Sequence, residues 1–239
     1  MTKTDRPESS KQQIFCFTHA GGSASFFDTI AAELSEYSVT AIEYPGHGKR
    51  FSEPFCGSLG ELAEDALRTI KAAYSGGGYA LFGYSMGCLV LIEALKRTIE
   101  SGTLPLPKCV FLAAHEPKPH TFLAEGPAML TDELIKDITV RFGGVPVQLI
   151  GNKAFWRLYT PMYRADYTLI LNYRYDADVK TDIPAVVFYS DSDTPVSGIE
   201  KWKRVFVGSC ELVRFDGSHF FIEQHHSQMA GIIDRNMRK

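Results

Sequence analysis

Short apolar runs alternate with amphipathic segments along most of this 239-residue chain, and this alternation limits the folds it can adopt. The runs are rich in β-branched and aromatic residues and end at Gly, Pro, His or Asp, as buried strands do. We expect six strands, over residues 14–18, 39–44, 79–83, 109–114, 185–189 and 211–215. Helical periodicity covers residues 26–34, 59–74, 86–99, 199–206 and 222–236. The pattern predicts an α/β fold with a mostly parallel sheet and helices on both faces.

One long interval interrupts this alternation. Residues 116–182 contain no convincing strand, and prolines and a Gly-Gly pair divide them into amphipathic pieces around 132–142 and 154–175. The interval is too long for a loop between two core strands, so we expect a helical insertion that forms a lid over one edge of the sheet. The remaining organisation is a polar, disordered tail over residues 1–13 and one domain over residues 14–239.

Charge and cysteine usage exclude several function classes. The net charge is −3, with no run of five or more Lys or Arg, which argues against nucleic acid or an anionic membrane as the main partner. No apolar run approaches the ~20 residues needed to span a bilayer, and the polar N-terminus lacks a signal-peptide pattern. The five cysteines are widely spaced, so neither a disulfide framework nor a zinc site is expected. We expect a cytoplasmic protein, with a monomer as the default.

The segment from Gly83 to Gly87 has the pattern G-x-S-x-G, with a predicted strand before it and an apolar helix after it. This context is typical of a nucleophile elbow, a sharp turn that exposes a serine at the end of a strand. Glycines are needed on both sides because the turn is strained and crowded by neighbouring backbone. Ser85 is therefore the candidate nucleophile. The alternative is that Ser85 only caps the following helix.

A serine nucleophile needs a base and a carboxylate that orients the base. His219 follows the last predicted strand directly and is the candidate base, the alternative being a histidine in an ordinary turn. For the acid we favour Asp193 over Asp191, which lies nearer the strand end and could cap the turn instead. Asp216 is a weaker third candidate. The order Ser85, Asp193, His219 is that of the α/β-hydrolases.

A tetrahedral intermediate also needs hydrogen-bond donors for its oxyanion. The backbone N–H of Met86, directly after Ser85 at a helix N-terminus, is one predicted donor. The Gly-rich loop 18–24 follows the first strand, and the Ala20 N–H is the second. Loss of one such donor typically costs ~3 to 4 kcal/mol of transition-state stabilisation. The alternative for this loop is an ordinary flexible turn.

The other histidines show no pattern that indicates chemistry. His47 lies in a turn, His115 and His120 flank the insertion, and His225 and His226 face different sides of a helix. None has metal-ligand spacing such as i, i+4 with a third partner. Walker A and G-x-G-x-x-G motifs are lacking as well, so we expect no cofactor and no metal.

Together these motifs resemble the type II thioesterases that accompany nonribosomal peptide and polyketide synthases. The resemblance covers about residues 14–230 and rests on HAGGSASFF at 19–27, EYPGHGKRFSEPF at 43–55, GYSMG at 83–87, RADYTLILNYRY at 164–175, SDSDTPVSGIEKW at 190–202 and FDGSHFFI at 215–222. It implies an α/β-hydrolase that removes acyl groups from the phosphopantetheine arm of an acyl- or peptidyl-carrier protein. It also implies that Ser85 is the nucleophile, His219 the base, Asp193 the acid, and Ala20 and Met86 the oxyanion donors.

The chain departs from the usual pattern of that family at four positions. Thr18 stands where a proline is common, Tyr84 replaces a frequent His, His47 an Arg, and Ser218 the second Gly of a Gly-Gly-His. None of these changes removes a catalytic group. Tyr84 and Ser218 are placed to alter the shape of the pocket or the mobility of the His219 loop.

The predicted insertion is locally basic, with six basic and two acidic residues over 136–174. Its net charge of +4 would suit an acidic carrier protein above the lid, although a solvated helical face is the alternative. The residues are Lys136, Arg141, Lys153, Arg157, Arg164 and Arg174, with Asp137 and Asp166.

Two other functions are compatible with the same residues. A hydrolase for free acyl-CoA or small esters would use the same triad, because the fold does not determine the substrate. A non-catalytic binding protein of this fold is the third possibility. Faster turnover of acyl-CoA or p-nitrophenyl esters than of acyl-carrier protein would favour the hydrolase of free substrates. Failure of a fluorophosphonate to label Ser85 would favour the binding protein.

Overall fold

A six-stranded sheet forms the centre of the molecule. The computed structural model describes residues 11–117, 130–174, 179–194 and 196–239. The strand order is β2-β1-β3-β4-β5-β6, and every neighbouring pair is parallel. The strands are β1 (Gln13–Phe17), β2 (Ser38–Ile42), β3 (Tyr79–Tyr84), β4 (Cys109–Ala113), β5 (Ala185–Tyr189) and β6 (Cys210–Arg214). The predicted α/β fold with a parallel sheet is confirmed, and each predicted strand end lies within two residues of the observed one.

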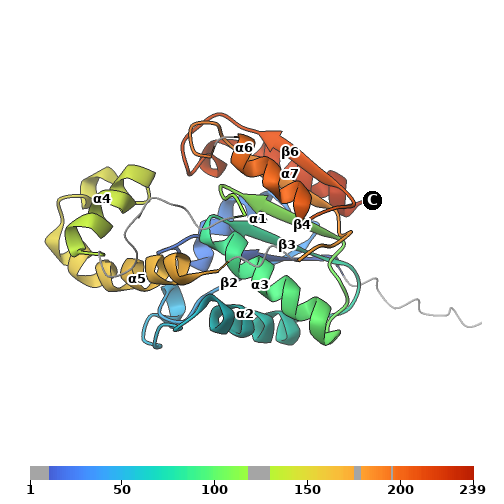
Figure 1. Ribbon diagram of the computed structural model, residues 1–239, viewed down its shortest axis with the longest axis horizontal. Helices are drawn as coiled ribbons and strands as arrows, with labels where there is room; N and C mark the ends of the chain where they lie inside the picture. The colour runs from blue at the N-terminus through green and yellow to red at the C-terminus, as the bar shows by residue number, and fades with distance from the viewer. Residues whose placement is uncertain (1–10, 118–129, 175–178, 195) are drawn as a thin grey trace, which may run out of the picture.

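Helices cover both faces of this sheet (Figure 1). They are α1 (Asp28–Glu33), α2 (Leu59–Ala73), α3 (Met86–Ser101), α4 (Asp132–Phe142), α5 (Lys153–Asn172), α6 (Val196–Ile199) and α7 (Ile222–Met237), with 3-10 turns η1 (Ala24–Phe27), η2 (Gly48–Arg50), η4 (Val147–Leu149) and η5 (Glu200–Arg204). Alternate side chains of a strand point to opposite faces, so the sheet has two cores. Phe15 and Phe17 pack with residues of α2 and α3, whereas Ile14 and Cys16 pack with residues of α1 and α7.

Local sequence signals explain where several helices begin and end. Ser58 caps α2 by accepting a hydrogen bond from the Glu61 N–H at 3.1 Å, as its S-x-x-E sequence indicates. Thr131 caps α4 in the same way, and the helix ends at Gly143, which has a left-handed φ of 82°. Asn152 caps α5 through hydrogen bonds from two backbone N–H groups. The expected helices over 132–142 and 154–175 therefore correspond to α4 and α5.

The segment between β4 and β5 extends away from the sheet (Figure 1). Its described residues form α4, η4 and α5 and contain no strand of the sheet. Helix α5 contacts both α4 and α3, so the segment is attached to the core through α3. The predicted N-terminal tail falls largely outside the described residues, and β1 already begins at Gln13. In the described part of the chain, no helix is long and apolar enough to cross a membrane.

The order of the strands determines where a ligand can bind. From β1 the chain passes to β2 on one side and then to β3 on the other side of β1. At such a switch point the loops after the two neighbouring strands diverge and leave a crevice at their carboxyl ends. Ser85 directly follows β3, and the loop that contains Ala20 follows β1. The two segments therefore face the same crevice.

Candidate active site

Ser85 occupies a strained turn between β3 and α3. Its φ of 54° and ψ of −122° are unusual for a residue other than glycine. The backbone holds this conformation, because the Ser85 N–H donates to the Ala113 carbonyl at 2.8 Å and its own carbonyl accepts from the Cys88 N–H at 2.9 Å. Strain of this kind persists where the surrounding structure fixes it, and it is concentrated at functional sites. The turn has the geometry that the G-x-S-x-G pattern predicts.

The two glycines of this motif allow close backbone contacts. A Cβ atom on Gly87 would lie 2.0 Å from the Phe17 carbonyl oxygen at the end of β1. A Cβ atom on Gly83 would lie 2.8 Å from the Cα atom of Cys88 in the first turn of α3. Both obstacles are backbone and cannot move aside as a side chain could. Glycine is therefore required for α3 to start this close to β1 and β3.

A histidine and an aspartate lie in line with the Ser85 hydroxyl. His219 Nε2 is 2.9 Å from Ser85 Oγ, and His219 Nδ1 is 2.8 Å from Asp193 Oδ1. A carboxylate only accepts hydrogen bonds, so Nδ1–H donates to Asp193 and Nε2 is free to accept the serine proton. The side chains of His219 and Asp193 are 8% and 3% exposed, which protects this arrangement from water.

The two alternative acids lie elsewhere. Asp191 accepts a hydrogen bond from Arg214 Nε at 2.5 Å and is 49% exposed. Asp216 Oδ1 lies 3.1 Å from Arg214 Nη2, and its side chain is 85% exposed. Arg214 therefore holds both carboxylates at the surface, and the structure brings Asp193 to His219 as the sequence analysis favoured.

The loop that carries His219 is held by hydrogen bonds to its backbone. The Tyr84 hydroxyl, directly before the nucleophile, donates to the His219 carbonyl at 2.7 Å. The Ser190 hydroxyl donates to the Gly217 carbonyl. The ring of Phe142 in α4 lies 4.8 Å from the His219 ring, so the insertion also contacts the base. The sequence marked Tyr84 only as a departure from a family pattern, and its contact with the His219 loop could not be derived from the chain.

The two predicted oxyanion donors have no competing partner within the described residues. Neither the Ala20 N–H nor the Met86 N–H donates to another described protein group. Met86 is the first residue of α3, where the helix dipole favours negative charge. Ala20 lines the same cavity as Ser85 and His219. The arrangement can therefore accept an anion that forms next to Ser85.

The cavity at this site is narrow and mostly apolar. Its volume is about 30 Å³, and helix α5 supplies one side through Tyr163, Tyr167 and Ile170. Tyr167 is fixed by a hydrogen bond between its hydroxyl and Thr139 Oγ1 of α4 at 2.9 Å. The full lining is His19, Ala20, Ser85, His115, Thr139, Phe142, Gly144, Tyr163, Tyr167, Ile170, His219 and Phe220.

Two residues without a predicted role in catalysis lie buried beside this site. His47, interpreted as a turn histidine, and Asp166, counted with the charges of the insertion, are each 2% exposed and lie 2.9 Å apart. Asp166 also accepts a hydrogen bond from the Gly21 N–H at 2.7 Å. A buried carboxylate in this insertion could not be recognised from the sequence, because its partners are 119 and 145 residues away.

The remaining histidines have separate surroundings. His19 and His115 line the cavity, and burial lowers the pKa of His19 to about 4. His225 lies 2.9 Å from the Asp216 carbonyl oxygen, whereas His120 is outside the described residues. Among the residues that the structure describes, no three His, Cys, Asp or Glu side chains are grouped so that they could hold a metal ion.

Comparisons with known proteins identify the family of the chain. The family described as the thioesterase domain matches residues 12–237. A probable cadicidin biosynthesis thioesterase of Streptomyces griseus is 30% identical over 91% of this chain, which spans 60% of that relative's length. Thioesterase PikA5 of Streptomyces venezuelae is 26% identical over 94% of this chain and 81% of its own.

Solved structures share the fold over nearly the whole chain. The type II thioesterase BorB from the borrelidin biosynthetic cluster is 29% identical, with a TM-score of 0.82 over 97% of this chain and 94% of that one. ClbQ from the colibactin pathway has a TM-score of 0.87 at 24% identity, covering 96% of this chain and 98% of its own. The six-stranded parallel sheet is thus the α/β-hydrolase sheet of these enzymes, and the chain belongs to the thioesterase domain family.

Proposed function

We propose that this protein is a serine thioesterase that hydrolyses acyl groups from the phosphopantetheine arm of a carrier protein. The observation that carries the proposal is the series of hydrogen bonds from Ser85 through His219 to Asp193 in a chain of the thioesterase family. Two relatives support the proposal, because one is named a probable cadicidin biosynthesis thioesterase and the other a type II thioesterase from the borrelidin biosynthetic cluster.

The geometry supports acyl transfer in two steps. His219 Nε2 takes the proton of Ser85 as Oγ attacks the thioester carbonyl carbon, and Asp193 stabilises the resulting imidazolium. The oxyanion is held by the N–H groups of Ala20 and Met86 until the thiol leaves with the proton from His219, which becomes neutral again. Water, deprotonated by His219, then attacks the acyl-serine ester, and Ser85 recovers its proton as the acid is released.

The size of the cavity supports a small acyl group. A volume of about 30 Å³ leaves no room for a long chain unless the helices of the insertion move. Because Tyr163, Tyr167 and Ile170 of α5 form one wall, we propose that the insertion acts as a lid whose position sets the accepted length. Acetyl and similarly short groups are therefore the expected substrates.

The outer side of the insertion supports a carrier protein as partner. A groove of about 940 Å³ lies between residues 55–57, α4 and α5. Exposed Lys136, Lys153 and Arg157 line it, and Lys136 is held with its Nζ 5.7 Å from the centre of the Trp156 ring. Asp132 and Glu133 also line the groove, and with Arg164 included the lining has a net charge of +2, which attracts an acidic surface and orients it over the lid. The free thiols of the chain fit a cytoplasmic location, which is part of the proposal.

Intact-mass spectrometry of loaded carrier protein tests the proposal. Acetyl-loaded and longer-acyl-loaded carrier proteins are incubated with the wild type, Ser85→Ala and Ser101→Ala, beside the matching acyl-CoAs. The Ser101 hydroxyl contacts Thr103 at the exposed end of α3, so Ser101→Ala is the matched serine control. We expect the wild type and Ser101→Ala to release the acetyl group, and Ser85→Ala to be slower by at least about 10³-fold.

The substrate arms separate the alternatives. Fast release from the carrier and slower cleavage of acyl-CoA support the proposed partner. The reverse preference, still dependent on Ser85, would identify a hydrolase of free thioesters. Turnover that survives in Ser85→Ala would remove the proposed nucleophile altogether.

A further inference from the structure

The peptide unit between Ala20 and Gly21 is held at both of its polar ends. On one side the Gly21 N–H donates to Asp166 Oδ2 at 2.7 Å. On the other side the Ala20 carbonyl oxygen lies 3.0 Å from His19 Nδ1, which donates to it. The Gly22 N–H donates to the His19 carbonyl at 3.1 Å and closes a tight turn around this peptide. The loop that bears the Ala20 N–H is therefore fixed by named contacts.

Helix α5 supplies the carboxylate and also packs against the turn. Gly21 has a left-handed φ of 72°, and a Cβ atom there would lie 1.9 Å from the Tyr163 ring. Tyr163 and Asp166 are three residues apart and so lie on the same face of the helix. The ring of Tyr163 and the carboxylate of Asp166 thus enclose Gly21 from α5.

His47 faces two hydrogen-bond acceptors. Its Nδ1 lies 2.9 Å from the Pro45 carbonyl oxygen and its Nε2 lies 2.9 Å from Asp166 Oδ2. Both ring nitrogens must carry a proton to satisfy these contacts, so the geometry is that of an imidazolium beside a carboxylate. Burial opposes the charge, but Asp166, with the Pro45 carbonyl and Glu43, outweighs it, so the pKa of His47 lies above its ordinary value. A buried carboxylate needs a partner of this kind.

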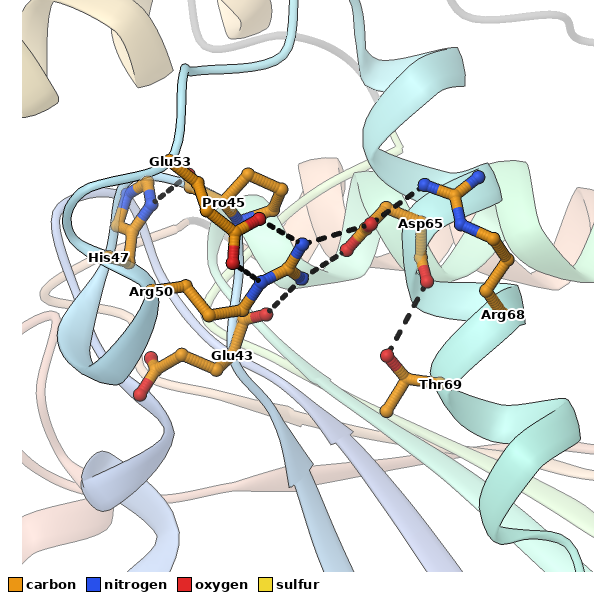
Figure 2. Close-up of polar contacts among 8 residues, drawn as sticks. All are labelled: Glu43, Pro45, His47, Arg50, Glu53, Asp65, Arg68 and Thr69. Atoms are coloured by element: carbon orange, nitrogen blue, oxygen red, sulfur yellow. Dashed lines mark hydrogen bonds and ion pairs between the residues drawn. The ribbon is translucent and has the colours of Figure 1, made fainter.

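The turn that presents His47 is itself anchored to the body of the protein (Figure 2). Arg50 donates to the Glu43 carbonyl at 3.0 Å and to Asp65 of α2 at 2.5 Å. The Glu43 carboxylate accepts a hydrogen bond from the Lys49 N–H at 3.1 Å. It also accepts one at 2.9 Å from the N–H of Ala24, the last residue of the Gly-rich loop 18–24. His47 is therefore a fixed support for the Asp166 carboxylate.

We propose that Asp166, charged and held by protonated His47, is a positioning residue that keeps the Ala20 N–H in place to bind the oxyanion. The inference rests on the proposed function, since it needs Ser85 as the nucleophile. It assigns α5 a second role besides lining the acyl cavity. A displacement of α5 would withdraw the hydrogen bond to Gly21 and so weaken transition-state stabilisation.

The test compares kcat and KM of the full-length wild type with Asp166→Ala, Asp166→Asn and Tyr173→Phe on acetyl-loaded carrier protein and acetyl-CoA. Tyr173→Phe removes a hydrogen bond from the C-terminal end of α5 to Glu93 of α3, so it perturbs the same helix away from the loop. We expect Asp166→Ala to lower kcat between about 10-fold and 10²-fold with KM within about twofold, below the ~10²- to 10³-fold loss of a complete donor. Asp166→Asn keeps an oxygen for the Gly21 N–H and recovers part of kcat, and Tyr173→Phe keeps it within about twofold.

A spectroscopic readout covers the case in which Asp166→Ala does not fold. The ¹⁵N chemical shifts of labelled His47 in the wild type report its protonation directly, with His47→Gln used for assignment. We expect two protonated ring nitrogens at pH 7, and a neutral His47 would overturn the inference. Unchanged kcat in folded Asp166→Ala, with Ser85→Ala inactive, would overturn it while leaving the proposed function intact. Full activity of Ser85→Ala would overturn both.

Discussion

Tyr84 donates its hydroxyl proton to the His219 carbonyl at 2.7 Å, so the residue before the nucleophile holds the loop that carries the base. Both groups are buried, and burial raises the pKa of Tyr84 well above its ordinary value, so the hydroxyl stays a donor. The Tyr84 side chain therefore links the nucleophile strand directly to the loop of the base.

We expect Tyr84→Phe to lower kcat by about fivefold with little change in KM, because a net hydrogen bond is worth about 1 kcal/mol and the His219 loop loses it. Steady-state kinetics on acetyl-loaded carrier protein measures this change. Tyr79→Phe is the control, since its hydroxyl donates to the Pro105 carbonyl at the same 2.7 Å at the opposite end of β3. An equal loss in both variants would show a general effect on stability rather than on the base.

Removing side-chain atoms from one wall of the cavity should change the preferred acyl length. Ile170 is 4% exposed and lines the cavity from α5, so Ile170→Ala enlarges it at a cost of about 2 to 4 kcal/mol in the free energy of unfolding. We expect the ratio of kcat/KM for octanoyl over acetyl carrier protein to rise by at least tenfold. Leu158→Ala, on the same helix but 51% exposed, should leave the ratio unchanged.

Charge reversal in the groove should weaken binding of the carrier protein alone. In the double variant Lys153→Glu and Arg157→Glu, we expect KM for acetyl-loaded carrier protein to rise about tenfold and KM for acetyl-CoA to change less than twofold. The matched change Lys203→Glu lies in η5 and should alter neither value. The effect on the carrier should decrease as ionic strength rises, because exposed charges are screened. Equal effects on both substrates would argue against docking at this groove.

Stability should depend on the protonation of His47. Its pKa is raised in the folded protein, so its contribution to the free energy of unfolding is complete below about pH 6.5 and is lost as the pH rises through the folded value. The titratable groups around it are Asp166, Glu43, His19 and Tyr44. In urea unfolding, the free energy of unfolding should be higher for the wild type than for His47→Gln, and this difference should be larger at pH 6 than at pH 9. A difference that grows with pH would show that His47 is neutral.

The sequence was informative where a structural signal is local. The strands and the elbow at Ser85 each depend on residues a few positions apart. His219 and Asp193 could be placed because each follows a strand, and parallel strands end at one edge. The choice between Asp193 and Asp191 needed the position of Arg214, which the chain order does not give.

The contacts of the insertion could not be predicted from the sequence, because they join residues that lie far apart in the chain. Asp166 was counted with its surface charges, yet it is buried against His47 and Gly21, because α5 turns this face toward the β1 and β2 loops. Helical periodicity indicates that a face is buried but not which loop covers it.

Helix α5 both lines the acyl cavity and supports Gly21, and this limits how the enzyme can be re-engineered. Its residues Tyr167 and Ile170 shape the acyl cavity, whereas Asp166, on an adjacent part of the same helix, completes the support of Gly21. A chimera that takes an insertion with a larger cavity from a relative would therefore also replace Asp166 by the relative's residue at that position. A graft that transfers the 43–50 turn together with α5 keeps His47 and Asp166 as a pair. A graft of the helix alone changes the acyl-length preference but loses the support of Gly21, and so lowers kcat.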